Sequence, residues 1–178
     1  MRYSPPSKGG ERSTLSKILV TGAAGFIGST LVERLLEDKL NTVVGVDCFT
    51  DYYDPEMKRA NIAAIDSTRF TLVDGDLAEL DLNDLLEDVE VVYHLAGQPG
   101  VRRSWGSEFA TYVGQNIMAT QLLLEACRYA SLLGSFIYAS SSSVYGDAER
   151  YPTSESDRPA PISPYGVSKL AGEHLVSL

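Results

Sequence analysis

The feature that most constrains the fold is a short apolar run, Ile18–Val20, that leads through a glycine-rich turn into a stretch with helical periodicity. The turn reads TGAAGFIG and places Gly22, Gly25 and Gly28 between the predicted strand and the predicted helix. Glycines let the chain turn tightly and approach a pyrophosphate, whose negative charge is stabilised at a helix N-terminus. The sequence therefore predicts a phosphate-binding turn in this first strand–helix unit.

Strand-like and helix-like segments alternate along the rest of the chain. Further apolar runs predict strands at 42–46, 70–73, 89–94 and 136–139, and helical patterns occupy 54–65, 80–86, 107–133 and the last residues. Strands that are apolar throughout are typical of a parallel sheet buried on both faces. The alternation predicts an α/β fold with a Rossmann-type doubly wound parallel sheet.

Length and composition favour one domain, because 178 residues with 44% hydrophobic content suffice for a single core. Residues 1–16 are polar and carry Pro, Gly and Ser without a signal-peptide-like apolar run, so we expect a disordered leader. Residues 17–178 are expected to form the cofactor-binding domain. No apolar stretch reaches the ~18 residues that span a bilayer, so no membrane partner is predicted.

Charge and cysteine usage exclude other classes. The net charge of −9 repels phosphate backbones and argues against non-specific nucleic-acid binding. The two cysteines, Cys48 and Cys127, have no CxxC spacing, which favours a cytoplasmic protein with reduced thiols. His94 is interpreted as a packed residue at a strand end. Because no second His or Cys stands at metal-ligand spacing, we predict no metal site.

An acidic residue, Asp47, ends the second predicted strand nineteen residues after Gly28. A carboxylate at this place can accept both hydroxyls of an adenosine ribose and would repel a 2′-phosphate, so the sequence favours NAD over NADP as cofactor. The alternative role for Asp47 is that of a turn or helix-capping acid.

Two later loops extend the predicted cofactor site. Asp76 follows the third strand, where its carboxylate is expected to accept the adenine amino group while Leu77 lies against the ring. A turn acid that caps the next helix is the alternative for Asp76. After the fourth strand, Leu95, Ala96 and Gly97 put mostly small residues where a cofactor must pass closely.

Reactive side chains gather near the end of the chain. The fifth strand is followed by the serine run Ser140–Ser143, and the last helix carries Tyr165 and Lys169 four residues apart. Side chains at i and i+4 share a helix face, so a phenol and an ammonium are brought together. Taken alone, this pair would be interpreted as an ordinary exposed i, i+4 pair.

With these motifs in order, the sequence resembles the extended short-chain dehydrogenase/reductase family, and within it the NAD-dependent nucleotide-sugar epimerases and dehydratases. TGAAGFIG, GDL, HLAG, Asn116 in the long helix, ASSSSVYG and YGVSK all match in order and spacing, over essentially all of Lys17 to Leu178. The resemblance implies NAD as cofactor. It adds Phe26, Ile27 and Asn116 to the residues expected to contact it.

The resemblance also implies a role for each reactive residue. Tyr165 is the expected base that removes a proton from a sugar hydroxyl while NAD⁺ accepts the hydride from the same carbon. Lys169 favours the phenolate form of Tyr165 as an adjacent cation and holds the nicotinamide ribose. Ser141 hydrogen-bonds the reacting sugar oxygen. Lys169 and Tyr165 thereby belong to both the catalytic and the cofactor-binding sets.

Three segments, DYYDP (51–55), AGQPGVR (96–102) and ASSSSVYG, are most similar to UDP-glucuronate 4-epimerases. This implies a UDP-linked hexuronate or hexose that contacts Arg102, Ser141, Ser142, Ser143 and Tyr165. UDP-glucose 4-epimerase and nucleotide-sugar dehydratase are the alternatives. A dehydratase is expected to carry Asp-Glu directly after its catalytic Ser or Thr, and here those positions hold serines.

Family members continue well beyond the YxxxK motif into a substrate domain that this chain lacks. We therefore expect either a fragment of a longer enzyme or a truncation that serves as a catalytically silent NAD-binding or sensing domain. A homodimer is implied through the helices that carry Asn116 and Tyr165. In the second of these helices, apolar positions from Val167 to Val176 recur at helical spacing and predict a face that requires burial.

Overall fold

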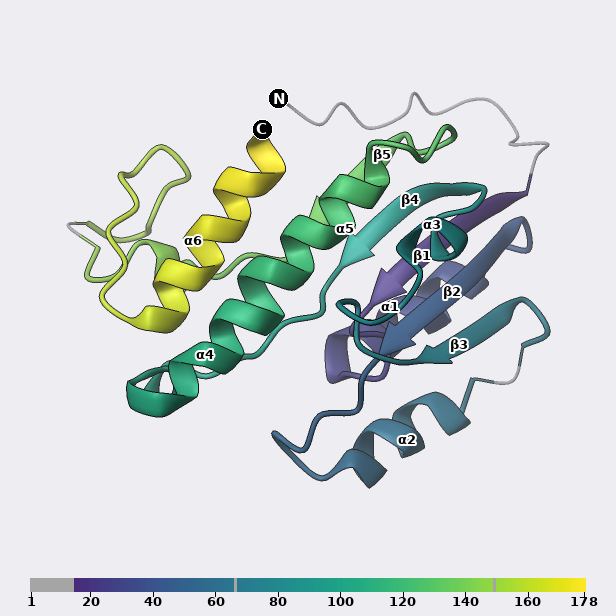
Figure 1. Ribbon diagram of the computed structural model, residues 1–178, viewed down its shortest axis with the longest axis horizontal. Helices are drawn as coiled ribbons and strands as arrows, with labels where there is room; N and C mark the ends of the chain where they lie inside the picture. The colour runs from purple at the N-terminus through teal and green to yellow at the C-terminus, as the bar shows by residue number, and fades with distance from the viewer. Residues whose placement is uncertain (1–14, 66, 149) are drawn as a thin grey trace.

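The computed structural model describes residues 15–65, 67–148 and 150–178, which form a parallel sheet with helices on both faces (Figure 1). The strand order is β3-β2-β1-β4-β5, and every neighbouring pair is parallel. The strands are β1 (Ser16–Thr21), β2 (Asn41–Asp47), β3 (Phe70–Asp74), β4 (Val89–His94) and β5 (Ser135–Tyr138). The order reverses between β1 and β4, the switch point where this architecture binds ligands. The predicted Rossmann-type α/β fold is confirmed.

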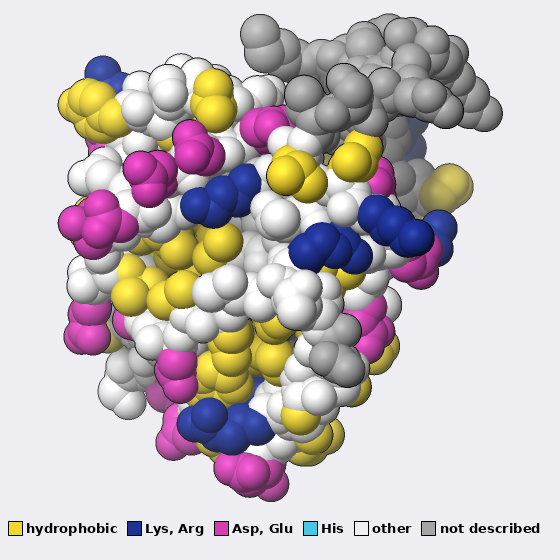
Figure 2. Space-filling view, turned by 90° about the vertical axis from the view of Figure 1, so that its right-hand side faces the viewer, with side chains coloured by type: hydrophobic (Ala, Val, Ile, Leu, Met, Phe, Trp, Pro, Cys, Tyr) yellow, Lys and Arg dark blue, Asp and Glu magenta, His cyan; other side chains and the backbone are white. Residues whose placement is uncertain are grey.

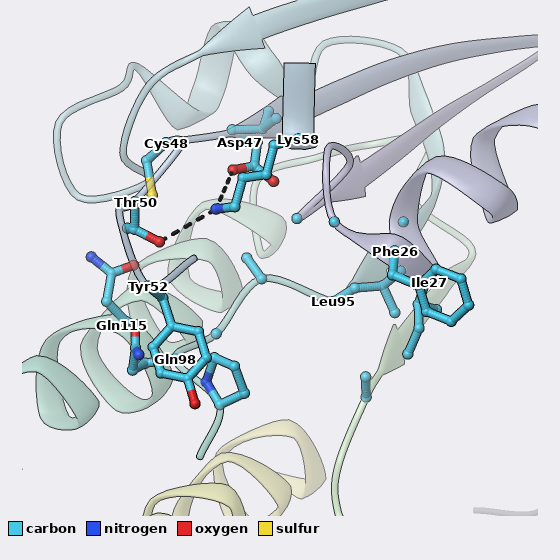
Figure 3. A pocket seen from close by; sticks show the side chains of 18 of the residues that line it. Phe26, Ile27, Asp47, Cys48, Thr50, Tyr52, Lys58, Leu95, Gln98 and Gln115 are labelled. Atoms are coloured by element: carbon cyan, nitrogen blue, oxygen red, sulfur yellow. Dashed lines mark hydrogen bonds and ion pairs between the residues drawn. The ribbon is translucent and has the colours of Figure 1, made fainter. Parts of the chain in front are cut away.

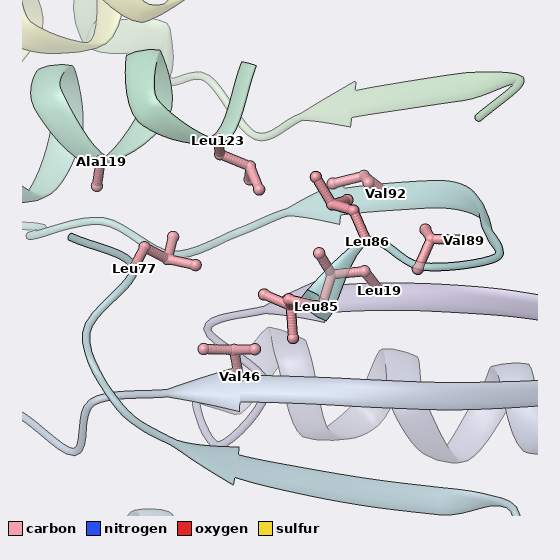
Figure 4. Packing of buried hydrophobic residues seen from close by; sticks show 9 residues of the cluster. All are labelled: Leu19, Val46, Leu77, Leu85, Leu86, Val89, Val92, Ala119 and Leu123. Atoms are coloured by element: carbon pink, nitrogen blue, oxygen red, sulfur yellow. The ribbon is translucent and has the colours of Figure 1, made fainter. Parts of the chain in front are cut away.

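Successive residues of β1 point to opposite faces of the sheet and into two different cores. Ile18 and Val20 pack with residues of α1 (Phe26–Leu36). Leu19, between them, belongs to a cluster with residues of α3 (Leu82–Leu85) and α5 (Ala119–Cys127) (Figure 4). Burial on both faces explains why the run Ile18–Val20 in the central strand β1 is apolar throughout.

Two helices begin directly after residues whose side chains cap them. Asp54 caps α2 (Pro55–Ala63) by accepting a hydrogen bond from the Glu56 N–H at 3.0 Å. Ser163 caps α6 (Pro164–Ser177) by accepting from the Gly166 N–H at 3.1 Å. Each helix has proline at its first position, where a missing N–H costs no hydrogen bond. Ser163 therefore fixes where the helix that carries Tyr165 and Lys169 begins.

The predicted continuous helix over 107–133 is wrong. The structure has a 3₁₀ turn η2 (Gly106–Glu108), α4 (Phe109–Tyr112), a π-helical segment η3 (Val113–Met118) and then α5, which ends at Cys127. Apolar periodicity does not register a single widened turn, and π-helical turns are frequent at functional sites. The helix ends early because the chain must turn into β5, where the Gly134 N–H donates to Glu90 O at 2.8 Å.

The fully buried residues of α6 are not its apolar ones. Its buried residues are Gly166, Ser168, Lys169 and Gly172, whereas Val167 is 48% exposed. The small residues let the helix approach its neighbours closely: a Cβ on Gly172 would overlap the Tyr138 hydroxyl. The inner face of α6 is thus small and polar, and its apolar positions lie on the partly exposed side.

The leader is predicted over residues 1–16. Residues 1–14 lie outside the described residues, and Ser16 is already the first residue of β1. No helix in the part of the chain that the structure describes is long and apolar enough to cross a membrane. On the face shown in Figure 2, acidic and basic side chains are interspersed with apolar ones. Basic residues do not form a continuous stripe among the described side chains of that face.

Candidate active site

A cavity of about 440 Å³ opens at the carboxyl ends of the strands, between the β1–α1 turn and the start of α6 (Figure 3). Twelve of the predicted site residues line it, namely Gly22, Gly25, Phe26, Ile27, Gly28, Asp47, Leu77, Leu95, Ala96, Gly97, Tyr165 and Lys169. They come from five separate segments of the sequence. The fold therefore brings the glycine turn, the acid after β2 and the Tyr–Lys pair to one wall.

The glycine turn is shaped by close backbone contacts. Gly22 has φ of 70°, and a Cβ there would lie 2.8 Å from the Ala96 N atom. A Cβ on Gly28 would overlap the carbonyl oxygen of Gly22. No side chain caps α1, whose first N–H groups lack partners within the helix. This N-terminus meets the geometric requirement for a phosphate site.

Asp47 is buried at the end of β2, where it meets a lysine that the sequence analysis did not single out. Its carboxylate accepts from the Ala24 N–H at 3.1 Å and the Phe49 N–H at 2.9 Å. Lys58 of α2, only 6% exposed, pairs with the same carboxylate at 3.3 Å and donates to Thr50 Oγ1 at 3.3 Å (Figure 3). Asp47 therefore lines the cavity and anchors its own turn, and a buried cation offsets its negative charge.

Asp76 takes the role of a turn acid. Its carboxylate accepts from the Ala78 N–H at 2.9 Å and from Gln115 Nε2 at 2.8 Å. Asp76 itself is not on the cavity wall, whereas Leu77 and Gln115 are. The predicted contact between Asp76 and adenine stays a prediction, and Gln115 is a polar wall residue that the sequence analysis missed.

Asn116 connects three elements from the π-helical segment η3. Its Oδ1 accepts from the Gln98 N–H at 2.6 Å, and its Nδ2 donates to Gln98 O at 3.1 Å and to Ser168 Oγ at 2.9 Å. The side chain is 1% exposed and lies behind the wall rather than on it. Asn116 thus holds the loop after β4 and α6 at a fixed separation, while its predicted cofactor contact stays a prediction.

His94 forms a fully paired chain of hydrogen bonds. Thr120 Oγ1 donates to Asn116 O at 2.7 Å and therefore accepts from His94 Nε2 at 2.9 Å. His94 Nδ1 then accepts from Thr21 Oγ1 at 2.7 Å, and that hydroxyl accepts from the Ala96 N–H at 3.2 Å. Burial, and then the charge of Lys169, lower the pKa of His94 to about 3. His94 is a neutral packed residue, as interpreted from the sequence.

Tyr165 and Lys169 both line the cavity from the first turns of α6. The Tyr165 ring meets the Tyr112 ring edge-on, with centroids 6.2 Å apart. Lys169 is 6% exposed, and its Nζ lies 4.3 Å from the centroid of the Tyr138 ring. Burial lowers the pKa of Lys169 to about 8, and the charge of Glu173 opposes that shift. The pair is not an ordinary surface pair.

Four of the five predicted substrate residues, Arg102 and Ser141 to Ser143, lie off the wall, whereas Tyr165 lies on it. Ser141 caps the 3₁₀ turn η4 (Ser142–Val144) by accepting from the Ser143 N–H at 3.2 Å. Ser140 lines the cavity, whereas the three serines that follow it do not. Arg102 is exposed in η1 (Arg102–Ser104) and is likewise absent from the wall. The substrate roles of these residues stay predictions.

Two further wall residues were missed for different reasons. Tyr52 lies in DYYDP, a segment used only to judge the subclass, and its ring stacks with the guanidinium of Arg103 at 5.2 Å. Gln98 lies just beyond the HLAG motif, so the motif does not include it. The Asn116 side chain binds the backbone N–H and carbonyl oxygen of Gln98. Within the described residues 15–65, 67–148 and 150–178, no group of three or more His, Cys, Asp or Glu side chains is arranged to hold a metal ion.

Comparison with known families decides the relationship. Residues 18–177 match the family described as NAD dependent epimerase/dehydratase. The chain belongs to this family. The resemblance to nucleotide-sugar epimerases and dehydratases that the motifs indicate is thereby confirmed.

Several members of the epimerase/dehydratase family are closely similar. An uncharacterized UDP-glucose epimerase of Bacillus subtilis, YtcB, is 50% identical over 160 residues, which are 89% of this chain and 50% of that protein. UDP-glucuronate 4-epimerase 1 of Arabidopsis thaliana is 44% identical over 168 residues, 92% of this chain and 39% of that protein.

A solved member of the family has the same fold. The crystal structure of UDP-glucuronic acid 4-epimerase from Bacillus cereus, in complex with UDP-glucuronic acid and NAD, matches with a TM-score of 0.88 and 51% identity. The match covers 90% of this chain and 51% of that chain. This chain therefore spans about half the length of the relatives it matches, or less.

Proposed function

We propose that the chain is the cofactor-binding part of an NAD-dependent epimerase that inverts C4 of a UDP-linked hexuronate or hexose. The observation that carries this proposal is that Tyr165 and Lys169 share one cavity wall with the glycine turn and Asp47. Relatives named as UDP-glucuronate 4-epimerase and UDP-glucose epimerase support the substrate class. Cytoplasmic location and a homodimer through the helices carrying Asn116 and Tyr165 are part of the same proposal.

The residues present fit NAD. The uncapped N-terminus of α1 suits the pyrophosphate, and the tight contacts of Gly22 and Gly28 exclude side chains from its approach. Asp47, Lys58 and Lys169 all line the cavity. In this proposal Asp47, with Lys58 beside it, would hold the adenosine ribose, and Lys169 would hold the nicotinamide ribose. When bound, NAD⁺ supplies a hydride acceptor for the C4 hydrogen of the sugar.

The chemistry of the chain's own residues follows from their placement. Tyr165 accepts the proton of the C4 hydroxyl, and the Lys169 ammonium stabilises the phenolate form that this requires. Ser141 Oγ accepts a hydrogen bond from Ser143, which leaves its own O–H free to donate to the reacting sugar oxygen. Ser142, Ser143 and Arg102 are proposed to receive the rest of the sugar.

Two alternatives differ in what they would require. A dehydratase is disfavoured by Ser142 and Ser143 at the positions where Asp-Glu is expected. A catalytically silent NAD-binding domain is favoured by one specific observation, namely that Arg102 and the serines Ser141 to Ser143 lie off the cavity wall. The epimerase and the silent NAD-binding domain would share the cofactor site and differ only in whether a UDP-sugar is turned over.

Turnover is tested on the gene product that contains these residues, incubated with NAD and UDP-glucuronate, with the C4 configuration of the product followed by NMR. We expect epimerisation, and we expect Tyr165→Phe to reduce its rate by about 10²–10⁴-fold while NAD affinity stays nearly unchanged, because only the base is removed. An undiminished rate in Tyr165→Phe would reject the base. NAD binding without turnover of UDP-glucuronate or UDP-glucose by the wild type would favour the silent domain.

A further inference from the structure

The ammonium of Lys169 lies in an unusual environment for a buried cation. It is 6% exposed, yet among the described residues no carboxylate lies within 4.0 Å of it and it donates no hydrogen bond to the protein. Its contact is the face of the Tyr138 ring, 4.3 Å from Nζ to the centroid. A cation over an aromatic face is attracted by the ring quadrupole, and the attraction is stronger where water is excluded.

The Tyr138 ring is fixed by neighbours on two sides. Its centroid lies 5.7 Å from that of His94, and Gly172 of α6 approaches its hydroxyl so closely that a Cβ there would overlap it. The hydroxyl itself is buried without a hydrogen-bond partner. An unpaired buried hydroxyl is destabilising, so hydrogen bonding does not explain the place of this side chain. The interaction that the Tyr138 ring does make is the one between its face and the Lys169 ammonium.

We propose that Tyr138 is a positioning residue that holds the Lys169 ammonium against its ring and so keeps a charged lysine beside Tyr165. A carboxylate would hold the ammonium as well, but its negative charge would cancel the field that Lys169 exerts on the phenol of Tyr165. An aromatic ring carries no net charge and leaves that field intact. The structural part of this inference stands on the contacts above, and its catalytic part rests on the proposed function.

Four titratable or charged groups face Lys169 from the elements around it. Tyr165 and Glu173 share its helix, Tyr138 comes from β5, and His94 from β4 is neutral. Glu173 favours the charged form of Lys169 and burial opposes it. Removing the ring leaves Glu173 in place, and any water that a smaller side chain admits would favour the charged lysine. A fall in the pKa of Lys169 therefore reports the loss of the ring itself.

The test compares Tyr138→Leu, which removes the ring, with Tyr138→Phe, which keeps it and removes only the unpaired hydroxyl. Lysine labelled with ¹³C at Cε is followed by NMR against pH, and the Lys169 resonance is assigned by its loss in Lys169→Met. We expect Tyr138→Phe to titrate like the wild type and Tyr138→Leu to raise the acid dissociation constant of Lys169 about tenfold. The Lys58 resonance is an internal control, because that ammonium pairs with Asp47 instead.

Equal titration of Lys169 in Tyr138→Leu and Tyr138→Phe would overturn the proposal. Tyr138→Met, which has an unbranched side chain without a ring, replaces Tyr138→Leu if the latter does not fold. NAD titration of the wild type separates the two claims. A wild type that binds no NAD contradicts the proposed function, whereas the dependence of the Lys169 titration on the Tyr138 ring is decided without any ligand.

Discussion

Two buried lysines lie on the wall of the same cavity, equally withdrawn from water, and they are held in opposite ways. Lys58 and Lys169 are each 6% exposed. Lys58 pairs with the Asp47 carboxylate at 3.3 Å, whereas Lys169 Nζ lies over the Tyr138 ring, 4.3 Å from its centroid. A buried ion pair largely cancels its own field, so Lys58 serves the geometry of the turn after β2, the proposed adenosine end of the cavity. A cation that forms no such ion pair keeps more of its field, which Tyr165 would require in its proposed role as a base.

The first way to break this comparison is to remove each lysine in turn. Lys58→Met would leave Asp47 as a buried carboxylate without its cation, and breaking a buried pair costs about 3–5 kcal/mol of the free energy of unfolding. Lys169→Met removes an unpaired buried charge and should leave stability near pH 7 unchanged or raised. Urea denaturation of both variants measures this. An equal loss of unfolding free energy in Lys58→Met and Lys169→Met would contradict the conclusion that the two lysines are held in different ways.

The pH dependence of stability sharpens the comparison. The folded-state pKa of Lys169, about 8, lies below the ordinary value of 10.5, so between these two pH values the unfolded chain binds more protons than the folded one. The free energy of unfolding contributed by Lys169 therefore rises with pH through this window, by ~3 kcal/mol when integrated.

Lys169→Met lacks this rise. Subtracting the stability of Lys169→Met from that of the wild type at each pH isolates it from other groups, such as Cys127, whose pKa burial raises to about 11. A flat difference between pH 7 and pH 10.5 would show that Lys169 is not held as a destabilised cation.

A smaller effect is expected at the adenosine end. Asp47→Asn removes the negative charge that faces the ribose and leaves Lys58 as an uncompensated cation, so affinity should shift from NAD toward NADP by about tenfold, which is 1–2 kcal/mol. Calorimetry with both cofactors measures the ratio. The control is Asp51→Asn, an exposed acid in the same loop that does not line the cavity. An unchanged ratio in Asp47→Asn would remove Asp47 from cofactor selection.

Sequence patterns predict the site around Lys169 better than the burial of Lys58. The Tyr165 and Lys169 pair follows from i, i+4 spacing, and the glycine turn follows from strand–helix periodicity. Nothing in MKRA marks Lys58 as buried, because a lysine in a short polar helix ordinarily faces water. Its burial depends on where α2 packs against the end of β2, which is a tertiary property.

The π-helical segment and the polar inner face of α6 were also beyond the sequence. Asn116 lies in a wide turn because its amide binds the Gln98 backbone and Ser168, two partners far away in the chain. The substrate role of the serine loop is predicted from the family resemblance. In the structure, the hydrogen bond of the Ser141 hydroxyl is with the Ser143 N–H of its own turn. Local motifs predict which residues lie at the ends of strands. The direction of a side chain such as Asn116 depends on hydrogen bonds to distant residues, which the motifs do not contain.

The most direct test of the account is calorimetric titration of NAD into the wild type, Gly28→Ala and Gly114→Ala, with the folded fraction of each checked by thermal melting. A Cβ on Gly28 overlaps the Gly22 carbonyl inside the phosphate-binding turn, whereas a Cβ on Gly114 meets open space. We predict saturable NAD binding by the wild type and Gly114→Ala, and at least a hundredfold weaker binding by folded Gly28→Ala, on the order of 3 kcal/mol. Absence of NAD binding by the folded wild type, or equal affinity in all three, would contradict the cofactor site on which the proposed function rests.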